Sequence, residues 1–174
     1  MKDVLIGLVG LFFFCFLVSL LFRFVLSMLY ELLNLWQRHD IALPKNATDE
    51  HLAAEKEKGL TNLEILLLTK TKVTDAGLVH LKGLTKLEWL VLESTQITDA
   101  GLAHLKGLPN LKSLNLSSTK ITDAGLVYLK GLTKLEELDL TDTQVTDAGL
   151  MHLEEHTNLE RLSLAGTQVT DAGL

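Results

Sequence analysis

The sequence predicts an α/β solenoid of short parallel strands and short helices, preceded by an N-terminal transmembrane helix. Two observations lead to this fold class. The first 36 residues hold most of the apolar excess, including all six Phe. From residue 63 onward the same leucine spacing recurs every 24 residues. A fixed period of roughly 20–50 residues indicates a stack of repeats.

The N-terminal segment, residues 1–38, is a candidate membrane anchor. Nineteen residues from Val4 to Phe22 contain no charged side chain. A helix of this length, rising about 1.5 Å per residue, nearly spans the hydrocarbon core of a bilayer. We place the transmembrane helix at 4–22, leave open its continuation to residue 30, and expect a juxtamembrane helix after it. A cleaved signal peptide is the alternative, but its apolar core would be shorter and would precede a small-residue cleavage site, which is absent.

The charges that flank this segment give little information about its orientation. Lys2 precedes the apolar run, while Arg23 and Arg38 follow it. The Lys and Arg counts that set membrane topology are therefore nearly even. Because a short N-terminus before such an anchor commonly stays inside, we expect a single-pass membrane protein with its repeats outside the cytoplasm.

Charge and cysteine usage exclude several classes of function. Residues 41–174 carry 13 basic and 19 acidic side chains, and an acidic surface without a basic cluster argues against a nucleic-acid partner. The single cysteine, Cys15, lies in the apolar run, so no intrachain disulfide or cysteine metal cluster can form. The sequence also lacks hydrolase, metalloprotease and phosphate-binding motifs. We expect no enzymatic activity, no cofactor and no small-molecule substrate.

The repeat unit reads L-x-x-L-x-L-x-x-T-x-[VI]-T-D-A-G-L-x-x-L-x-x-[LH]. The string T-D-A-G-L begins at Thr74, Thr98, Thr122, Thr146 and Thr170. In the first half of the unit, residues two apart lie on one face of a strand, so Leu66 and Leu68 point inward. Such a short strand must pair with the strands of neighbouring units. The sequence therefore predicts a parallel ladder with one strand per repeat.

The second half of the unit has the start and stop signals of a helix. Thr74 is a good N-cap, and Asp75 in the first turn interacts favourably with the helix dipole. Gly83 follows the last turn and can adopt the left-handed conformation that ends helices. Its equivalents are Gly59, Gly107 and Gly131. A strand, a helix and the next parallel strand make one right-handed coil per repeat.

Residues 60–174 resemble leucine-rich repeats, whose common core is L-x-x-L-x-L-x-x-[NC]-x-L. Five such cores are present, and the T-D-A-G-L variant is similar to repeats of planctomycete-like bacteria. The resemblance implies a horseshoe with its parallel sheet on the concave face. The family's Asn position carries Thr in this sequence, at Thr71, Thr95, Thr119, Thr143 and Thr167. The resemblance implies that this column hydrogen-bonds the loop backbone, and a hydroxyl offers fewer donors for that role.

The ends of the repeat array differ from its middle. Residues 39–46 indicate a linker after the anchor, and residues 47–62 indicate a degenerate capping repeat with a T-D pair at Thr48. Residues 63–174 are repeats of 24 residues, the last of which is incomplete and has no polar cap. We therefore expect a fragment of a longer repeat protein. A short chain whose last unit frays is the alternative.

Two polar columns raise the question of metal binding. An aspartate recurs in every T-D-A-G-L string, which suggests calcium, and His80, His104 and His152 share one helical position, which suggests zinc. A position at the start of each helix explains the aspartates, and Tyr128 interrupts the histidine column. We therefore expect no metal site.

The outward positions of the strands are the candidate protein-binding site, because the repeat pattern does not constrain them. The early repeats present an apolar group around Trp89, and the fourth presents acidic side chains. An exposed apolar patch beside acidic residues is typical of a protein-binding surface. The candidate residues are Ile65, Leu67, Trp89, Val91, Glu93, Glu137 and Asp139. The alternative is that the apolar members are only good strand formers, covered by the linker.

The predicted function is that of a membrane-anchored, non-enzymatic module that binds a protein partner through its concave sheet. One alternative is the sensor or scaffold portion of a longer receptor or enzyme, whose catalytic domain would follow this sequence. A second alternative is a structural spacer, which the uniformity of the repeats favours. The patterned outward side chains favour the interaction module.

Overall fold

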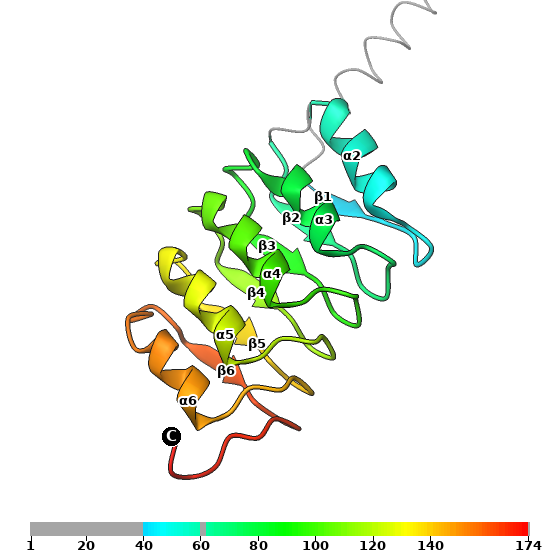
Figure 1. The fold of residues 1–174 in the computed structure, drawn as a ribbon. Helices are drawn as coiled ribbons and strands as arrows, with labels where there is room; N and C mark the ends of the chain where they lie inside the picture. Colours follow the sequence, from blue (N-terminus) through cyan, green and yellow to red (C-terminus); the bar gives the residue numbers. More distant parts are fainter. Residues whose placement is uncertain (1–39, 60–61, 174) are drawn as a thin grey trace, which may run out of the picture. The chain divides into compact units, whose positions relative to one another are not determined.

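The computed structural model describes residues 40–59 and 62–173. They form a parallel sheet of six strands in the order of the sequence, with the helices along one face (Figure 1). The strands are β1 Asp40–Ala42, β2 Ile65–Leu67, β3 Trp89–Val91, β4 Ser113–Asn115, β5 Glu137–Asp139 and β6 Arg161–Ser163. The helices are α2 Asp49–Glu57, α3 Asp75–Leu78, α4 Asp99–Leu102, α5 Asp123–Leu126 and α6 Asp147–Leu150.

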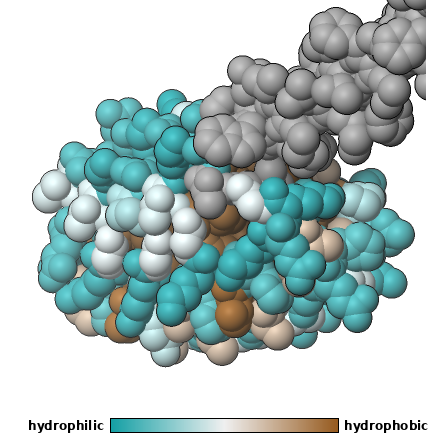
Figure 2. Space-filling model, turned by 90° about the horizontal axis from the view of Figure 1, so that it is seen from above, coloured by the Kyte–Doolittle hydropathy of each residue, from teal (hydrophilic) through white to brown (hydrophobic). Residues whose placement is uncertain are grey.

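The constant repeat length stacks leucine on leucine through the core. Leu66 pairs with Leu90, and Leu90 pairs with Leu114, in the parallel ladder that the sequence predicts. These three side chains are at most 1% exposed. Burial of each one stabilises the fold by about 1.5–3 kcal/mol. Seen from above, the described surface is mainly hydrophilic, with hydrophobic residues showing only in separate places (Figure 2).

Strand β1 corrects the linker that we expected over residues 39–46. Asp40–Ala42 pairs in parallel with β2, and Ile41 is buried opposite Leu66. The first coil of the solenoid therefore begins at β1, and helix α2 places Leu52 in the same core. The sequence could not show this, because Asp-Ile-Ala has only one inward residue and no repeat spacing.

The α-helix of each repeat is shorter than the sequence predicts. The four residues D-A-G-L make one α-helical turn, which continues as a 3-10 helix. These 3-10 helices are Val79–Leu81, Ala103–Gly107, Val127–Gly131 and Met151–Leu153. Gly59 and Gly83 have φ of 73° and 97°, which confirms their role as helix stops. The prediction that Gly107 and Gly131 also stop helices is wrong. Each is the last residue of a 3-10 helix that is two residues longer than Val79–Leu81.

The threonine column bonds within its own coil. The Thr71 hydroxyl donates to the carbonyl oxygen of Leu68 at 2.8 Å, just where the chain leaves the strand. The equivalent threonines make the same bond at 2.5–2.7 Å. Four of the five hydroxyl bonds are buried. The carbonyl oxygens of Leu68, Leu140 and Leu164 also accept the backbone N–H of the same threonine at 3.2 Å, so the hydroxyl adds a second donor there.

The aspartate of T-D-A-G-L joins each repeat to the next. The Asp75 carboxylate accepts hydrogen bonds from the backbone N–H of Thr98 at 2.8 Å and from its hydroxyl at 2.6 Å. Gly101 makes room for this contact, because a Cβ there would lie 2.4 Å from Asp75 Oδ1. We call this series the Asp–Thr ladder. Its other pairs are Asp49–Thr74, Asp99–Thr122, Asp123–Thr146 and Asp147–Thr170.

A left-handed residue ends the turn after each of the strands β2–β6. Lys70, Ser94, Ser118 and Asp142 have φ of 53–57°, although none of them is glycine. Their backbone N–H groups donate across to the next coil, as Ser94 does to the Ser117 carbonyl at 2.9 Å. This hydrogen bond holds a conformation that is costly for any residue with a Cβ. The fifth position, Gly166, adopts φ of 70° without that strain.

The last repeat departs from the leucine pattern. His156 takes the place of Leu132 of the preceding repeat and is 6% exposed. One ring nitrogen, Nε2, lies 3.0 Å from the Leu129 carbonyl oxygen, while Nδ1 has no partner among the described residues. In β6, the inward Leu162 is 37% exposed, because no described strand lies beyond it.

The predicted anchor lies outside the described residues. Across residues 40–59 and 62–173, none of the helices combines the length and the apolar character that a membrane crossing requires. The transmembrane helix over 4–22 therefore stays a prediction.

Candidate protein-binding face

The outward side chains of the strands form two rows that cross the sheet. Paired residues on neighbouring strands lie side by side, about 4.8 Å apart. The first row is Asp40, Ile65, Trp89, Ser113, Glu137 and Arg161. The second row is Ala42, Leu67, Val91, Asn115, Asp139 and Ser163. Six of the seven candidate residues lie in these rows, and Glu93 follows Val91 by two positions.

The apolar part of both rows lies on β2 and β3. Leu67 and Trp89 are 39% and 38% exposed, respectively, and Ile65 and Val91 are half-buried. Leu67 keeps this exposure although β1 pairs directly beside it. The segment expected to be a linker therefore extends the sheet and leaves the outer surface of Leu67 open.

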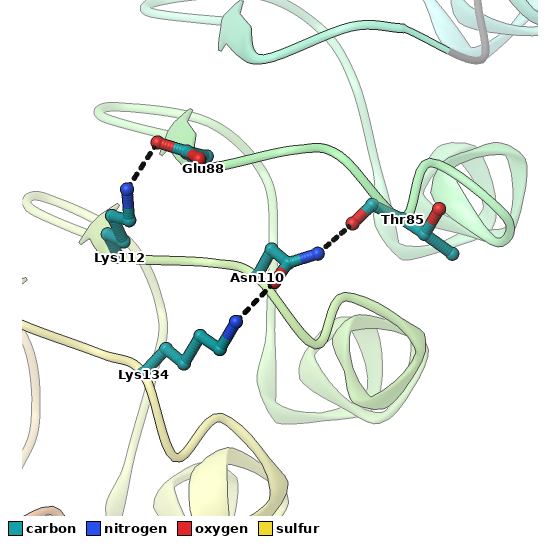
Figure 3. Close-up of polar contacts among 5 residues, drawn as sticks. All are labelled: Thr85, Glu88, Asn110, Lys112 and Lys134. Carbon is teal, nitrogen blue, oxygen red and sulfur yellow. Dashed lines mark hydrogen bonds and ion pairs between the residues drawn. The ribbon is translucent and has the colours of Figure 1, made fainter.

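Lys112 borders this apolar group. Its Nζ lies 5.6 Å from the centroid of the Trp89 ring. The same Nζ lies 2.7 Å from Glu88 Oε2, and Figure 3 shows this ion pair. The hydrogen bond to Glu88 and the charges of nearby glutamates raise the pKa of Lys112. The ammonium group lies over the Trp89 ring at a distance that permits a cation–π contact.

Glu137, the acidic candidate residue of the first row, is already paired. Glu137 forms an ion pair with Arg161 on the next strand, and its second oxygen accepts a hydrogen bond from the Ser113 hydroxyl at 3.2 Å. These three residues make a polar chain across β4, β5 and β6. Glu137 thus differs from the other acidic candidates, because its charge is compensated within the sheet.

Two polar members of the second row, Asn115 and Asp139, accept hydrogen bonds from the turns that follow their strands. Asn115 Oδ1 accepts hydrogen bonds from the backbone N–H of Ser117 at 2.8 Å and from its hydroxyl at 2.7 Å. Asp139 Oδ1 accepts the backbone N–H of Thr141 at 2.9 Å. Such bonds over two residues fix the side-chain direction before any partner arrives.

Two of the candidate carboxylates, Glu93 and Asp139, form no ion pair within the described part of the chain. Asp139 makes no ion pair within the described residues, and the Glu93 side chain has neither a hydrogen bond nor an ion pair there. Both lie within two strands of the apolar group, which leaves a negative charge next to an exposed hydrophobic surface.

A second polar ladder lies where the chain enters the strands. Asn110 donates to the carbonyl oxygen of Thr85 at 2.7 Å, and its amide oxygen accepts a hydrogen bond from Lys134 at 2.6 Å (Figure 3). The sequence contains a periodic signal for this ladder, separate from the leucine pattern. Asn and Lys alternate at 24-residue steps, as Asn62, Lys86, Asn110, Lys134 and Asn158.

The structure shows the surroundings of the aspartates and histidines that suggested calcium and zinc. Both oxygens of Asp75 accept hydrogen bonds from Thr98, so the aspartate column is occupied by protein donors. His80, His104 and His152 are half-buried beside the core. Among residues 40–59 and 62–173 there is no group of three His, Cys, Asp or Glu side chains able to hold an ion.

Comparisons with known proteins identify the repeats. Residues 85–145 and residues 155–174 each match a family model described as leucine-rich repeat. A search of curated proteins finds no match.

Two similar solved structures are internalins from Listeria monocytogenes. Internalin inlF is 33% identical over 64% of this chain, with a TM-score of 0.58, and internalin C2 is 33% identical over 68%, with a TM-score of 0.59. The matched region spans 31% of the first protein and 48% of the second.

Proposed function

Because residues 85–145 and 155–174 are leucine-rich repeats, we propose that this chain is a non-enzymatic module that binds a protein partner. The partner would lie on the open face of the sheet, the face that we expect to be concave. One observation carries this proposal. Leu67 and Trp89 are both well exposed on neighbouring strands, although every other large apolar side chain of β2–β5 is at least half-buried.

The position of these two side chains supports binding over a spacer role. A spacer needs only the inward leucines, and it gains nothing from an exposed indole ring. Trp residues are enriched among those that dominate binding energies, and they act best when a partner removes them from water. Lys112 and Glu88 flank Trp89 with charge, as the polar rim of an interface does.

We further propose that residues 4–22 anchor the module in a membrane, with the repeats outside the cytoplasm. The support is the uncharged length of this segment and the Tyr and Trp that follow it. Extraction of membranes with alkaline carbonate tests the anchor. The full chain should remain in the membrane pellet, and a variant with three charged substitutions in the segment should be released.

A crosslinking experiment tests the binding face. Full-length chain would be crosslinked in the cells that produce it, and the products of Leu67→Ser and Trp89→Ser would be compared with those of wild type. Val79→Ser and Val127→Ser serve as controls, because these valines are 44% and 43% exposed on the helical side. A partner lost from the sheet variants and kept by the controls supports the proposal. A partner kept by all four variants would refute the proposed face.

A further inference from the structure

We propose that the partner is an extended protein segment in which a basic side chain and an apolar side chain are four residues apart. This inference depends on the proposed function, because it names the chemistry that would fill the same face. It is carried by four residues of the second row, Leu67, Val91, Asn115 and Asp139, which pair in register across β2–β5.

Asn115 presents a hydrogen-bond donor in the middle of the row. The Ser117 backbone N–H, 2.8 Å away, can only donate, so the Asn115 atom facing it is the oxygen. The amide NH2 must therefore point away from this turn, and it has no hydrogen-bond partner among the described residues. A free amide donor matches a backbone carbonyl group of a crossing chain.

Asp139 presents a negative charge one strand further on. Its Oδ1 is fixed by the Thr141 N–H at 2.9 Å, and the neighbouring cation, Arg161, pairs with Glu137 instead. The uncompensated Glu93 adds to the negative potential of the same face. A lysine or arginine of the partner would complete Asp139 with a charge-assisted hydrogen bond.

The spacing of the row sets the spacing in the partner. Leu67 and Asp139 are three strands apart, which is about 14 Å. An extended chain that crosses the strands advances about 3.3 Å per residue, and it returns side chains to the same face at every second position. Side chains at positions i and i+4 are therefore about 13 Å apart and face the sheet together. The carbonyl groups between them pass over Asn115.

The test uses the immobilised full chain in a mild detergent and a phage library of random 12-residue peptides. Wild type should enrich peptides that carry Lys or Arg four residues from a large apolar residue. Synthetic copies of these peptides should bind Asp139→Asn about tenfold more weakly or worse, since a charge-assisted bond is lost. Asn at position 139 can keep the turn bond, as Asn115 does. Glu154→Gln makes the same change of charge on an exposed residue of the helical side and should leave binding unchanged.

A charge-neutral exchange gives the sharpest control. The double variant Asn115→Asp with Asp139→Asn keeps the composition and both turns but moves the carboxylate one strand nearer to Leu67. The carboxylate is then two strands, or about 10 Å, from Leu67. A spacing of four residues, about 13 Å, no longer matches this distance, so peptides with that spacing should no longer be enriched.

The outcomes separate the two proposals. Peptides that lose binding in Leu67→Ser but show no basic preference, and bind Asp139→Asn equally, would overturn the inference and leave the proposed function standing. Peptides that bind Leu67→Ser and Trp89→Ser as well as wild type would overturn both. Failure to enrich any peptide would overturn the proposal that the partner is an extended segment. The crosslinking experiment would still test the proposed binding face.

Discussion

Adding one methyl group to a glycine of T-D-A-G-L tests the Asp–Thr ladder directly. In Gly125→Ala, the new Cβ would lie 2.3 Å from Asp99 Oδ1 and 3.1 Å from both Asp99 Cγ and Leu102 Cδ1. The carboxylate therefore has to move. In its present position it holds the N–H of Thr122 at 2.8 Å and the hydroxyl at 2.6 Å.

The expected size of the effect follows from opposing contributions. In an unconstrained helix, Gly→Ala stabilises by about 1 kcal/mol. Displacing Asp99 weakens two hydrogen bonds to a charged group, each with a net contribution of roughly 1.5–3 kcal/mol. We expect Gly125→Ala to lower the free energy of unfolding by about 2–3 kcal/mol. Gly131→Ala should be neutral or slightly stabilising, because no heavy atom lies within 4 Å of its Cβ and its φ is not positive.

Urea unfolding of the full chain in a mild detergent, followed by far-ultraviolet circular dichroism, measures these changes. A second pair of variants isolates the cause. In an Asp99→Ala background the carboxylate is gone, so the added methyl group at position 125 should no longer destabilise the protein. The reasoning is refuted if Gly125→Ala is as harmless as Gly131→Ala, or if it is equally harmful with and without Asp99.

Three further predictions concern single positions. Thr119→Val should lower the free energy of unfolding by about 1–2 kcal/mol and Thr119→Ser by less, because only the valine leaves the buried Leu116 carbonyl without a donor; urea midpoints check this. Ser94→Gly should raise the thermal midpoint and Ser94→Ala should not, since only glycine relaxes a φ of 54°. The N–H and hydroxyl of Thr170 hold the pKa of Asp147 below its ordinary value. The ionised Asp147 carboxylate therefore contributes to the free energy of unfolding above its unfolded-state pKa. This contribution is lost as the pH falls below about 4. Asp147→Asn should show a smaller loss of stability than wild type in urea titrations between neutral and acid pH.

Much of the fold can be predicted because the repeat length is constant. A step of 24 residues places Leu66, Leu90 and Leu114 in register, and alternation within three residues decides which side chains face outward. The same logic correctly predicts the exposure of Leu67 and Trp89. Inward packing and outward exposure depend only on periodicity, which a sequence displays directly.

The contacts between repeats could not be predicted in the same way. The position of Asp75 at a helix start is visible in the sequence, but its bonds to Thr98 depend on how closely two coils approach. That approach is possible because Gly101 lacks a side chain, so a residue with no chemistry of its own decides the role of the aspartate. Strand β1 was missed for a different reason, because it lies before the first repeat and has no periodic neighbour.

Within the candidate site, ion pairing between neighbouring strands distinguishes residues that look alike in the sequence. Glu137 and Asp139 are both acidic and both outward, yet only Glu137 has Arg161 beside it on the next strand. The 24-residue step could have revealed this pair. The orientation of the Asn115 amide could not be read from any spacing, because it depends on the turn that presents the Ser117 N–H.

The Asp–Thr ladder also has a consequence for how such proteins change over generations. Each central repeat receives bonds from the aspartate before it and supplies an aspartate to the threonine after it, so its two ends are complementary. Duplication of 24 codons would therefore insert a coil that fits both neighbours without any compensating mutation. Each duplication would add one new position to both rows of the sheet face, and that position could then diverge while the ladder stays intact. The array can lengthen the outward face of its sheet by copying alone.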